Sequence, residues 1–232
     1  MLRPCVIPLA AAVVAAAPLA AQDLASLCKT VTRPPVGAWA EYSYTGGPQA
    51  GSTMRVAAVG TEARGDTTML WLEMSMRAPV PSGDSGVNAT IPVIAKVLVP
   101  GWGTDMSRPR TAIMKYGSAP AMLMPTDQGG GPGGAGPDLL DNCRSSQVVG
   151  WEQVSVPDGS YRALHVRSSS GDENAWIVPG IAFGVVKDSS GDSSGVVLAR
   201  HGTGATSQIT EQPRPYDPQL LMQLLAPKPK GP

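Results

Sequence analysis

Two short segments carry the residue types of a serine nucleophile. Residues 83–86 read Gly-Asp-Ser-Gly and residues 191–195 read Gly-Asp-Ser-Ser-Gly, as around the nucleophile of serine proteases. Such a serine needs a histidine base within hydrogen-bond reach and a carboxylate that orients this base. No histidine precedes Ser85, and His165 comes only about one hairpin before Ser193. Turns also require Gly, Asp and Ser, so we interpret both segments as turns and keep a serine hydrolase as a remote alternative.

The two histidines of the chain, His165 and His201, offer little else for catalysis or metal binding. They lack the Glu-x-x-His spacing or the cysteine cluster that zinc sites use. His165 alternates with Tyr161 and Ala163, which places it on the more polar face of its strand. We expect both histidines to be surface or hydrogen-bonded structural residues. The sequence therefore predicts no catalytic residue, no metal site, no cofactor and no enzymatic activity.

Two methionine pairs are candidates for lining a cavity or for binding a metal. Met74 and Met76, and likewise Met122 and Met124, are two residues apart, and a strand places such pairs on one face. Paired thioethers suit Cu(I), whereas methionine also lines adaptable apolar surfaces. Two leucines extend the face of the first pair, as in a plain apolar wall, so we interpret the pairs as core or cavity lining, with copper as the alternative. The predicted ligand-lining residues are Tyr42, Tyr44, Leu70, Leu72, Met74, Met76, Met122 and Met124.

The N-terminus has the pattern of a secretory signal peptide. Arg3 and the amino terminus precede an apolar run over 6–17, and the small-residue stretch 18–21 suits cleavage after Ala21 or, alternatively, after Ala20. The run is too short and too often interrupted by proline to span a bilayer, and the chain has no later candidate. A buried alanine-rich helix is the alternative. We therefore expect residues 1–21 to be removed and the protein to reach the periplasm or another extracytoplasmic compartment.

Two cysteines would remain after cleavage, Cys28 and Cys143. In an oxidising compartment two remaining cysteines most simply form a disulfide. The alternative is two unpaired, buried thiols. Leu27 before Cys28 is a poor match to the small residue that precedes a lipid-modified cysteine, so the sequence favours a protein without a lipid anchor.

The charges exclude two classes of partner. The chain has 18 basic and 18 acidic residues without a basic stripe. Nucleic-acid binders carry such a stripe, and membrane-surface proteins often carry a polybasic cluster. We therefore expect no nucleic acid and no integral membrane span, and we consider a lipid or lipoprotein acyl chain, or other envelope proteins, as partners.

The rest of the chain indicates one antiparallel β domain over residues 22–226. Short stretches alternate between apolar and polar residues, turn residues separate them, and no helices alternate with them. Residues 128–137 read as a flexible Gly/Pro loop, residues 216–226 as a helix and residues 227–232 as a tail. Strands are predicted over residues 38–45, 52–59, 67–76, 87–99, 111–116, 121–124, 148–156, 161–167, 175–178, 181–187 and 196–201. The proline at 92 predicts that its strand is an edge strand or contains a bulge.

Four segments support a resemblance to known proteins: Val149-Gly-Trp-Glu-Gln-Val-Ser-Val-Pro-Asp-Gly-Ser-Tyr161, Ala175-Trp-Ile-Val178, Phe183-Gly-Val-Val-Lys187 and His201-Gly-Thr-Gly-Ala205. They resemble uncharacterised exported bacterial proteins with the half-barrel fold of the outer-membrane lipoprotein carriers and receptors (LolA/LolB-like). The resemblance implies a strongly curved antiparallel sheet, closed on one side by one or two short helices, around an apolar cavity for acyl chains. None of that family's functional residues matches a position here.

Taken together, these patterns predict an exported binding or carrier protein for an apolar or lipid-like ligand. The alternative is a structural or protein-interaction module of the cell envelope whose apolar faces form an ordinary closed core.

Overall fold

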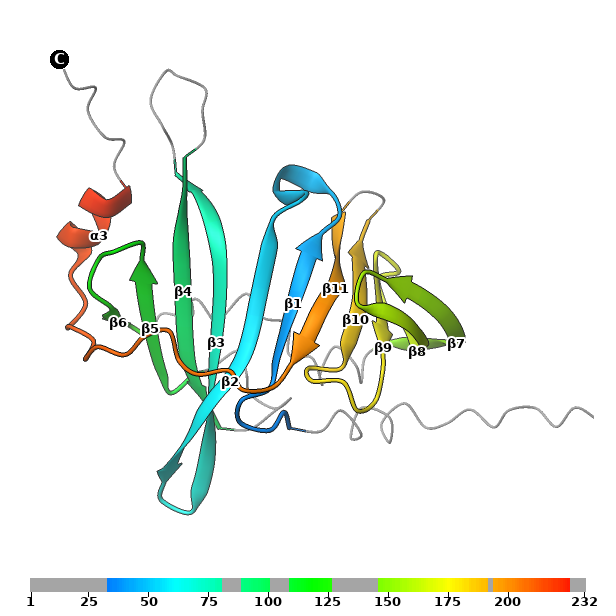
Figure 1. Ribbon diagram of the computed structural model, residues 1–232, viewed down its shortest axis with the longest axis horizontal. Coiled ribbons are helices and arrows are strands. Elements are labelled where there is room, and N and C mark those ends of the chain that lie inside the picture. Colours follow the sequence, from blue (N-terminus) through cyan, green and yellow to red (C-terminus); the bar gives the residue numbers. More distant parts are fainter. Residues whose placement is uncertain (1–32, 81–88, 101–108, 127–145, 192–193, 226–232) are drawn as a thin grey trace, which may run out of the picture.

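The described part of the chain folds into one antiparallel sheet. The computed structural model describes residues 33–80, 89–100, 109–126, 146–191 and 194–225. Eleven strands pair in the order β6-β5-β4-β3-β2-β1-β11-β10-β9-β8-β7 (Figure 1). The strands are β1 (Trp39–Tyr44), β2 (Thr53–Arg64), β3 (Thr67–Val80), β4 (Ala89–Val99), β5 (Thr111–Tyr116), β6 (Met122–Met124), β7 (Gln147–Val156), β8 (Gly159–Arg167), β9 (Glu173–Ile177), β10 (Val185–Ser190) and β11 (Ser194–Gly202). A short 3-10 helix, η1 (Gly47–Gln49), and the helix α3 (Pro218–Leu225) complete it.

This architecture confirms the predicted fold class, a mainly β protein with a curved antiparallel sheet. The predicted signal peptide, Cys28, Cys143, the Gly/Pro loop and the tail lie outside the described residues. None of the helices in the described ranges is long and apolar enough to cross a membrane.

The sheet consists of two consecutive meanders that meet between distant parts of the chain. β1 to β6 pair in chain order, and so do β7 to β11. The two meanders join because β11 pairs with β1, for example Tyr42 with Leu198. Residues from both meanders, such as Leu72, Ala112, Val154 and Trp176, pack in one buried cluster. Strands this far apart in the sheet can share a cluster only if the sheet curves around this face, which we call the concave face.

The strand that contains Pro92 was predicted to be an edge strand or to contain a bulge, and the structure differs from this prediction. This strand, β4, is an interior strand, paired with β3 over its whole length and with β5 from Val93 onward. The Gly117 amide donates to the Pro92 carbonyl at 2.7 Å, so the backbone polar groups of Pro92 point to the β5 side, just beyond the last paired residue, Tyr116. Pro92 thus lies where β5 ends, and its missing N–H costs only the reciprocal bond of the pair with Gly117.

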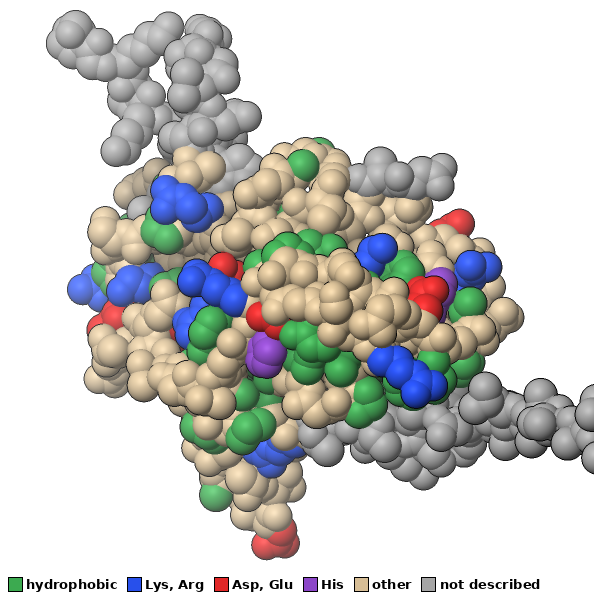
Figure 2. Space-filling model, turned by 45° about the vertical axis from the view of Figure 1, so that its right-hand side comes forward, with side chains coloured by type: hydrophobic (Ala, Val, Ile, Leu, Met, Phe, Trp, Pro, Cys, Tyr) green, Lys and Arg blue, Asp and Glu red, His purple; other side chains and the backbone are tan. Residues whose placement is uncertain are grey.

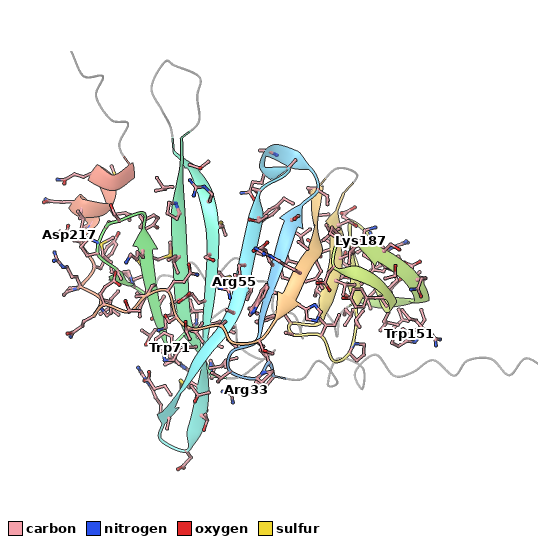
Figure 3. All side chains as sticks on the ribbon, viewed as in Figure 1. Arg33, Arg55, Trp71, Trp151, Lys187 and Asp217 are labelled. Atoms are coloured by element: carbon pink, nitrogen blue, oxygen red, sulfur yellow. The ribbon has the colours of Figure 1, made fainter. Side chains whose placement is uncertain are left out.

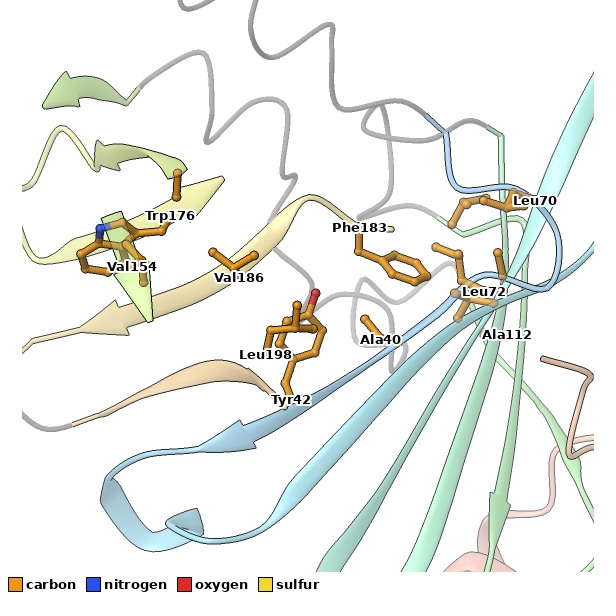
Figure 4. Packing of buried hydrophobic residues seen from close by; sticks show 14 residues of the cluster. Ala40, Tyr42, Leu70, Leu72, Ala112, Val154, Trp176, Phe183, Val186 and Leu198 are labelled. Atoms are coloured by element: carbon orange, nitrogen blue, oxygen red, sulfur yellow. The ribbon is translucent and has the colours of Figure 1, made fainter. Parts of the chain in front are cut away.

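The loop before β10 differs from the strand predicted over residues 181–187. Residues 181–184, predicted to begin a strand, form a turn in which Phe183 has φ 67° and Gly184 has φ 74°. Such backbone conformations end strand pairing. The Phe183 side chain is buried in the concave cluster, where Figure 4 shows it between Val186 and the leucines of β3.

Hydrogen bonds fasten the β7–β8 turn to β11. The Asp158 amide donates to the Leu198 carbonyl at 3.3 Å, and His201 Nδ1 lies 2.8 Å from Asp158 Oδ2. The same carboxylate accepts a hydrogen bond from the Tyr161 hydroxyl, which raises the pKa of Tyr161 to about 12. Burial would raise the pKa of Asp158, but the hydrogen bonds from Tyr161 and His201 outweigh it and lower the pKa. This end of the sheet therefore curls over the concave face.

A segment after β11 covers the opposite, convex face of the first meander. Residues 203–217, which we call the strap, cross β2 to β5 and end at α3 (Figure 1). The Ala205 amide donates to the Gly37 carbonyl at 2.8 Å, and the Arg214 amide donates to the Ala121 carbonyl at 2.8 Å. Ile209 packs with Ile113 and Ala121 in a second, smaller cluster. The Asp217 carboxylate then caps α3 by accepting from the amide of Leu220 at 3.1 Å.

Candidate functional site: the methionine-rich concave face

Cross-strand register arranges the concave face of the first meander into rows, because directly opposed residues of paired strands point to the same face. The first row is Tyr42, Met54, Met76, Val93 and Tyr116. The second row is Ala40, Val56, Met74, Ala95, Met114 and Met122. The third row is Ala58, Leu72, Val97, Ala112 and Met124, and Leu70 and Val99 form a fourth.

Burial falls steadily from the fourth row to the first. Leu70 and Val99 are 0 % exposed and Leu72 is 3 % exposed. The next residues on the same face of β3, Met74 and Met76, are half-buried. We call the buried residues of the third and fourth rows the floor: Ala58, Leu70, Leu72, Val97, Val99 and Ala112. The half-buried residues Met54, Val56, Met74, Met76, Val93 and Tyr116 are the rim. The rim is an apolar surface that the described part of the chain leaves partly open.

The predicted ligand-lining residues divide between these two zones. Leu70 and Leu72 lie in the floor, and Tyr42 and Met122 are also buried. Met74 and Met76 lie in the rim. Two others are half-buried next to it: Met124, which packs against the concave cluster, and Tyr44.

Two tyrosines mark where the rim meets β1. The buried Tyr42 hydroxyl donates to the Val185 carbonyl at 3.1 Å, and its burial raises the pKa of Tyr42 above the ordinary value. The Tyr44 hydroxyl lies 3.8 Å from the Met54 sulfur, a contact that orients this thioether, and burial raises the pKa of Tyr44 as well. Both phenols are neutral at pH 7, as tyrosines ordinarily are, and burial favours the neutral form further.

The structure adds Met54, Val56, Val93, Met114 and Tyr116 to the face that the sequence indicated only in part. All five lie within predicted strands, but polar residues flank only Met54 on both sides, whereas Val93 lies between Pro92 and Ile94. What the sequence did not supply was the register that brings these residues opposite Met74 and Met76.

The two histidines take part in structural contacts. His165 is stacked on Trp176 with ring centroids 4.5 Å apart, and its Nε2 lies 2.9 Å from Asn174 Oδ1. Its Nδ1 lies 3.3 Å from Glu152 Oε1. His201 contacts Asp158 as described above. Ser85 and Ser193, the candidates for a serine nucleophile, lie outside the described residues.

Figure 2 shows how charged groups are distributed over one face of the described residues. Basic, acidic and hydrophobic side chains are interspersed on the face shown in Figure 2. Within the described ranges, no three His, Cys, Asp or Glu side chains are grouped so that they could hold a metal ion.

Comparisons with known proteins identify no family. No family model matches the chain, and no curated protein matches it. Two solved structures resemble it at 10 % identity with a TM-score of 0.34: a protein from Bacteroides fragilis that is assigned as exported and has a YmcC-like fold, and a protein from Parabacteroides distasonis that is assigned as a lipoprotein. Each comparison covers 74 % of this chain and 98 % of the other chain.

Proposed function

We propose that this chain is an exported binding or carrier protein and that the rim of its concave face takes up an apolar or lipid-like ligand, such as an acyl chain. The observation that carries the proposal is the half-burial of a continuous apolar surface across β2, β3 and β4. Contiguous exposed apolar surface commonly marks a site of interaction. The signal-like N-terminus supports an extracytoplasmic location, where acyl chains need a carrier.

The side chains of the rim suit a flexible apolar ligand. Methionine is unbranched and polarisable, and it adapts to ligands of irregular shape. The rows also place small residues beside the methionines: Ala95 lies opposite Met74 on one side and Met114 on the other. Methionines that flank an alanine can move over it without displacing a bulky neighbour.

Within the described residues, loops cover part of the concave face. In the described residues the single α-helix, α3, lies beyond β6 and not over this face (Figure 1). The β7–β8 turn and the Phe183 loop cover the β11 side instead. A ligand would therefore enter at the rim, on the side away from Phe183.

Equilibrium binding of the fluorescent fatty acid 11-(dansylamino)undecanoate tests the proposal. Met76→Glu places a charge in the rim at a half-buried position that the fold can tolerate. Burying that charge against an acyl chain is costly, so we expect at least about a tenfold loss of affinity, equivalent to about 1.4 kcal/mol.

Met222→Glu is the matched control, because Met222 is 72 % exposed on α3. It should bind the probe like the wild type, and circular dichroism should show that both variants are folded. Equal binding by Met76→Glu and the wild type, or no binding of the probe by the wild type, would refute the proposal. Lipid found by mass spectrometry in protein purified from its native envelope would identify the ligand.

The β7 edge favours a second candidate, a protein-interaction module. β7 ends the sheet and pairs only with β8 in the described residues. It exposes Val148, Val149 and Trp151, and Figure 3 shows Trp151 at this end of the sheet. A long apolar edge strand is a template for pairing with another chain. A photo-reactive cross-linker at Val149 should then give one discrete adduct in the envelope that Trp151→Lys abolishes. Diffuse or absent adducts would exclude this candidate.

A further inference from the structure

Sulfur is concentrated on one face of the sheet. The described residues contain eight methionines: Met54, Met69, Met74, Met76, Met114, Met122, Met124 and Met222. Six of them lie on the concave face, on β2, β3, β5 and β6. The exceptions are Met69, which alternates with the concave residue Leu70, and Met222 on α3. A wall that only had to be apolar could use leucine throughout.

Three of these thioethers form a compact group at the rim. Met54 of β2 lies directly opposite Met76 of β3, and Met74 lies two residues along the same face. Directly opposed side chains have Cβ atoms about 4.5–5.5 Å apart, and diagonal neighbours remain within reach of long side chains. The flexible methionine side chain allows three sulfurs so placed to converge on one point. All three residues are half-buried, so an ion can reach them from outside.

The surroundings favour a soft ion of low charge. Two valines border the group: Val56 of β2 lies opposite Met74, and Val93 of β4 lies opposite Met76. The nearby charged residues Glu73 and Lys96 alternate with concave residues and belong to the convex face, where both contact the strap. Neutral thioethers among apolar side chains do not compensate a divalent charge, whereas thioethers are preferred ligands of Cu(I).

We propose that Met54, Met74 and Met76 form a thioether site for Cu(I). The Tyr44 hydroxyl, 3.8 Å from the Met54 sulfur, holds this thioether at the outer side of the group. The site does not depend on acyl-chain binding, although both use the rim.

Methyl NMR of the chain labelled with [methyl-13C]methionine tests the site sulfur by sulfur. Free thiols are blocked with N-ethylmaleimide, because cysteine thiolates would compete. Cu(I) is added anaerobically, and Ag(I) serves as its redox-stable analogue. We expect the methyl signals of Met54, Met74 and Met76 to shift together and to saturate with one bound ion, while those of Met69 and Met222 stay in place. Zn(II) should leave all of them unchanged.

The variant Met54→Leu/Met74→Leu/Met76→Leu keeps the volume and polarity of the rim and removes its sulfur. It should lose the bound ion, whereas Met69→Leu/Met222→Leu should retain it. Because leucine preserves the apolar surface, the first variant should still bind the fatty-acid probe, so failure of the copper site and failure of the carrier function give different results. If the triple variant does not fold, Met54→Leu alone should weaken binding. The proposal is overturned if the Met222 signal shifts with the others, if no signal shifts, or if Met54→Leu/Met74→Leu/Met76→Leu keeps wild-type affinity for the ion.

Discussion

The two faces of the first meander differ in which side chains they bury. On the convex face, Glu73 is only 2 % exposed, because the strap covers it. On the concave face, the next residue, Met74, is half-buried although it is apolar. This contrast inverts the usual preference, in which charged residues are exposed and apolar ones buried, and it is the reason for proposing the site on the concave face.

The hydrogen bonds of Glu73 show how completely the convex face is committed to the strap. Its carboxylate accepts from the Gln208 amide at 3.0 Å and from the Ser207 hydroxyl at 2.7 Å, and Lys96 Nζ donates to that hydroxyl at 3.0 Å. Farther along the strap, Lys115 Nζ lies 2.5 Å from Glu211 Oε1. These contacts join three charged residues of the convex face, Glu73, Lys96 and Lys115, to the strap.

The largest effect on the free energy of unfolding should come from shortening a fully buried side chain of the concave face. Met122 is 0 % exposed, so Met122→Ala should lower the free energy of unfolding by roughly 2–5 kcal/mol, through lost burial and the cavity left behind. Met76→Ala, at the half-buried rim, should cost clearly less. Urea denaturation of both variants measures the difference, and equal losses would contradict the contrast between the buried part of the concave face and its half-buried rim.

The next effect concerns the link between the convex face and the strap. Glu73→Ala leaves the backbone and side-chain amides of Gln208 without their acceptor, which should lower the free energy of unfolding by about 1–3 kcal/mol. Proteolysis should then cut the strap earlier than in the wild type. Glu62→Ala, a more exposed carboxylate on the neighbouring strand, is the control. If the two substitutions have equal effects, Glu73 does not fasten the strap.

The smallest effect is a dependence on pH at the far end of the strap. The hydrogen bond from Lys115 lowers the pKa of Glu211 from 4.5 to about 2. Because the folded state holds the ionised form, its stabilisation is complete above pH 4.5 and is lost as the pH falls toward 2. The difference in unfolding free energy between the wild type and Glu211→Gln should therefore shrink between pH 5 and pH 2. A difference that stays constant over this range would exclude this ion pair as its source.

The strands of both meanders could be predicted from the sequence because their signal is local. The alternation of apolar and polar residues predicted β5 with its observed bounds. It also placed Met74 and Met76 on one face of their strand. The Phe183 turn was missed, because its apolar residues read as strand and only the backbone conformation at Phe183 and Gly184 interrupts it.

The relation between the two faces could not be predicted. Glu73 reads as an outward polar residue of an alternating strand, and its burial depends on Gln208, 135 positions further along the chain. The pairing of β1 with β11 and the alignment of Met54 with Met76 likewise depend on register and strand order. Residue periodicity reports which side chains share a face of one strand, but not which strands lie beside it or what covers them.

Methionine-methyl NMR with dodecanoate as the added ligand tests most directly whether the open concave rim takes up an apolar chain. The account predicts saturable shifts of the Met54, Met74 and Met76 signals, with the Met69 signal on the opposite face unchanged. Signals at the rim that stay fixed at saturating dodecanoate, or a response that begins at Met69 or Met222, would contradict it.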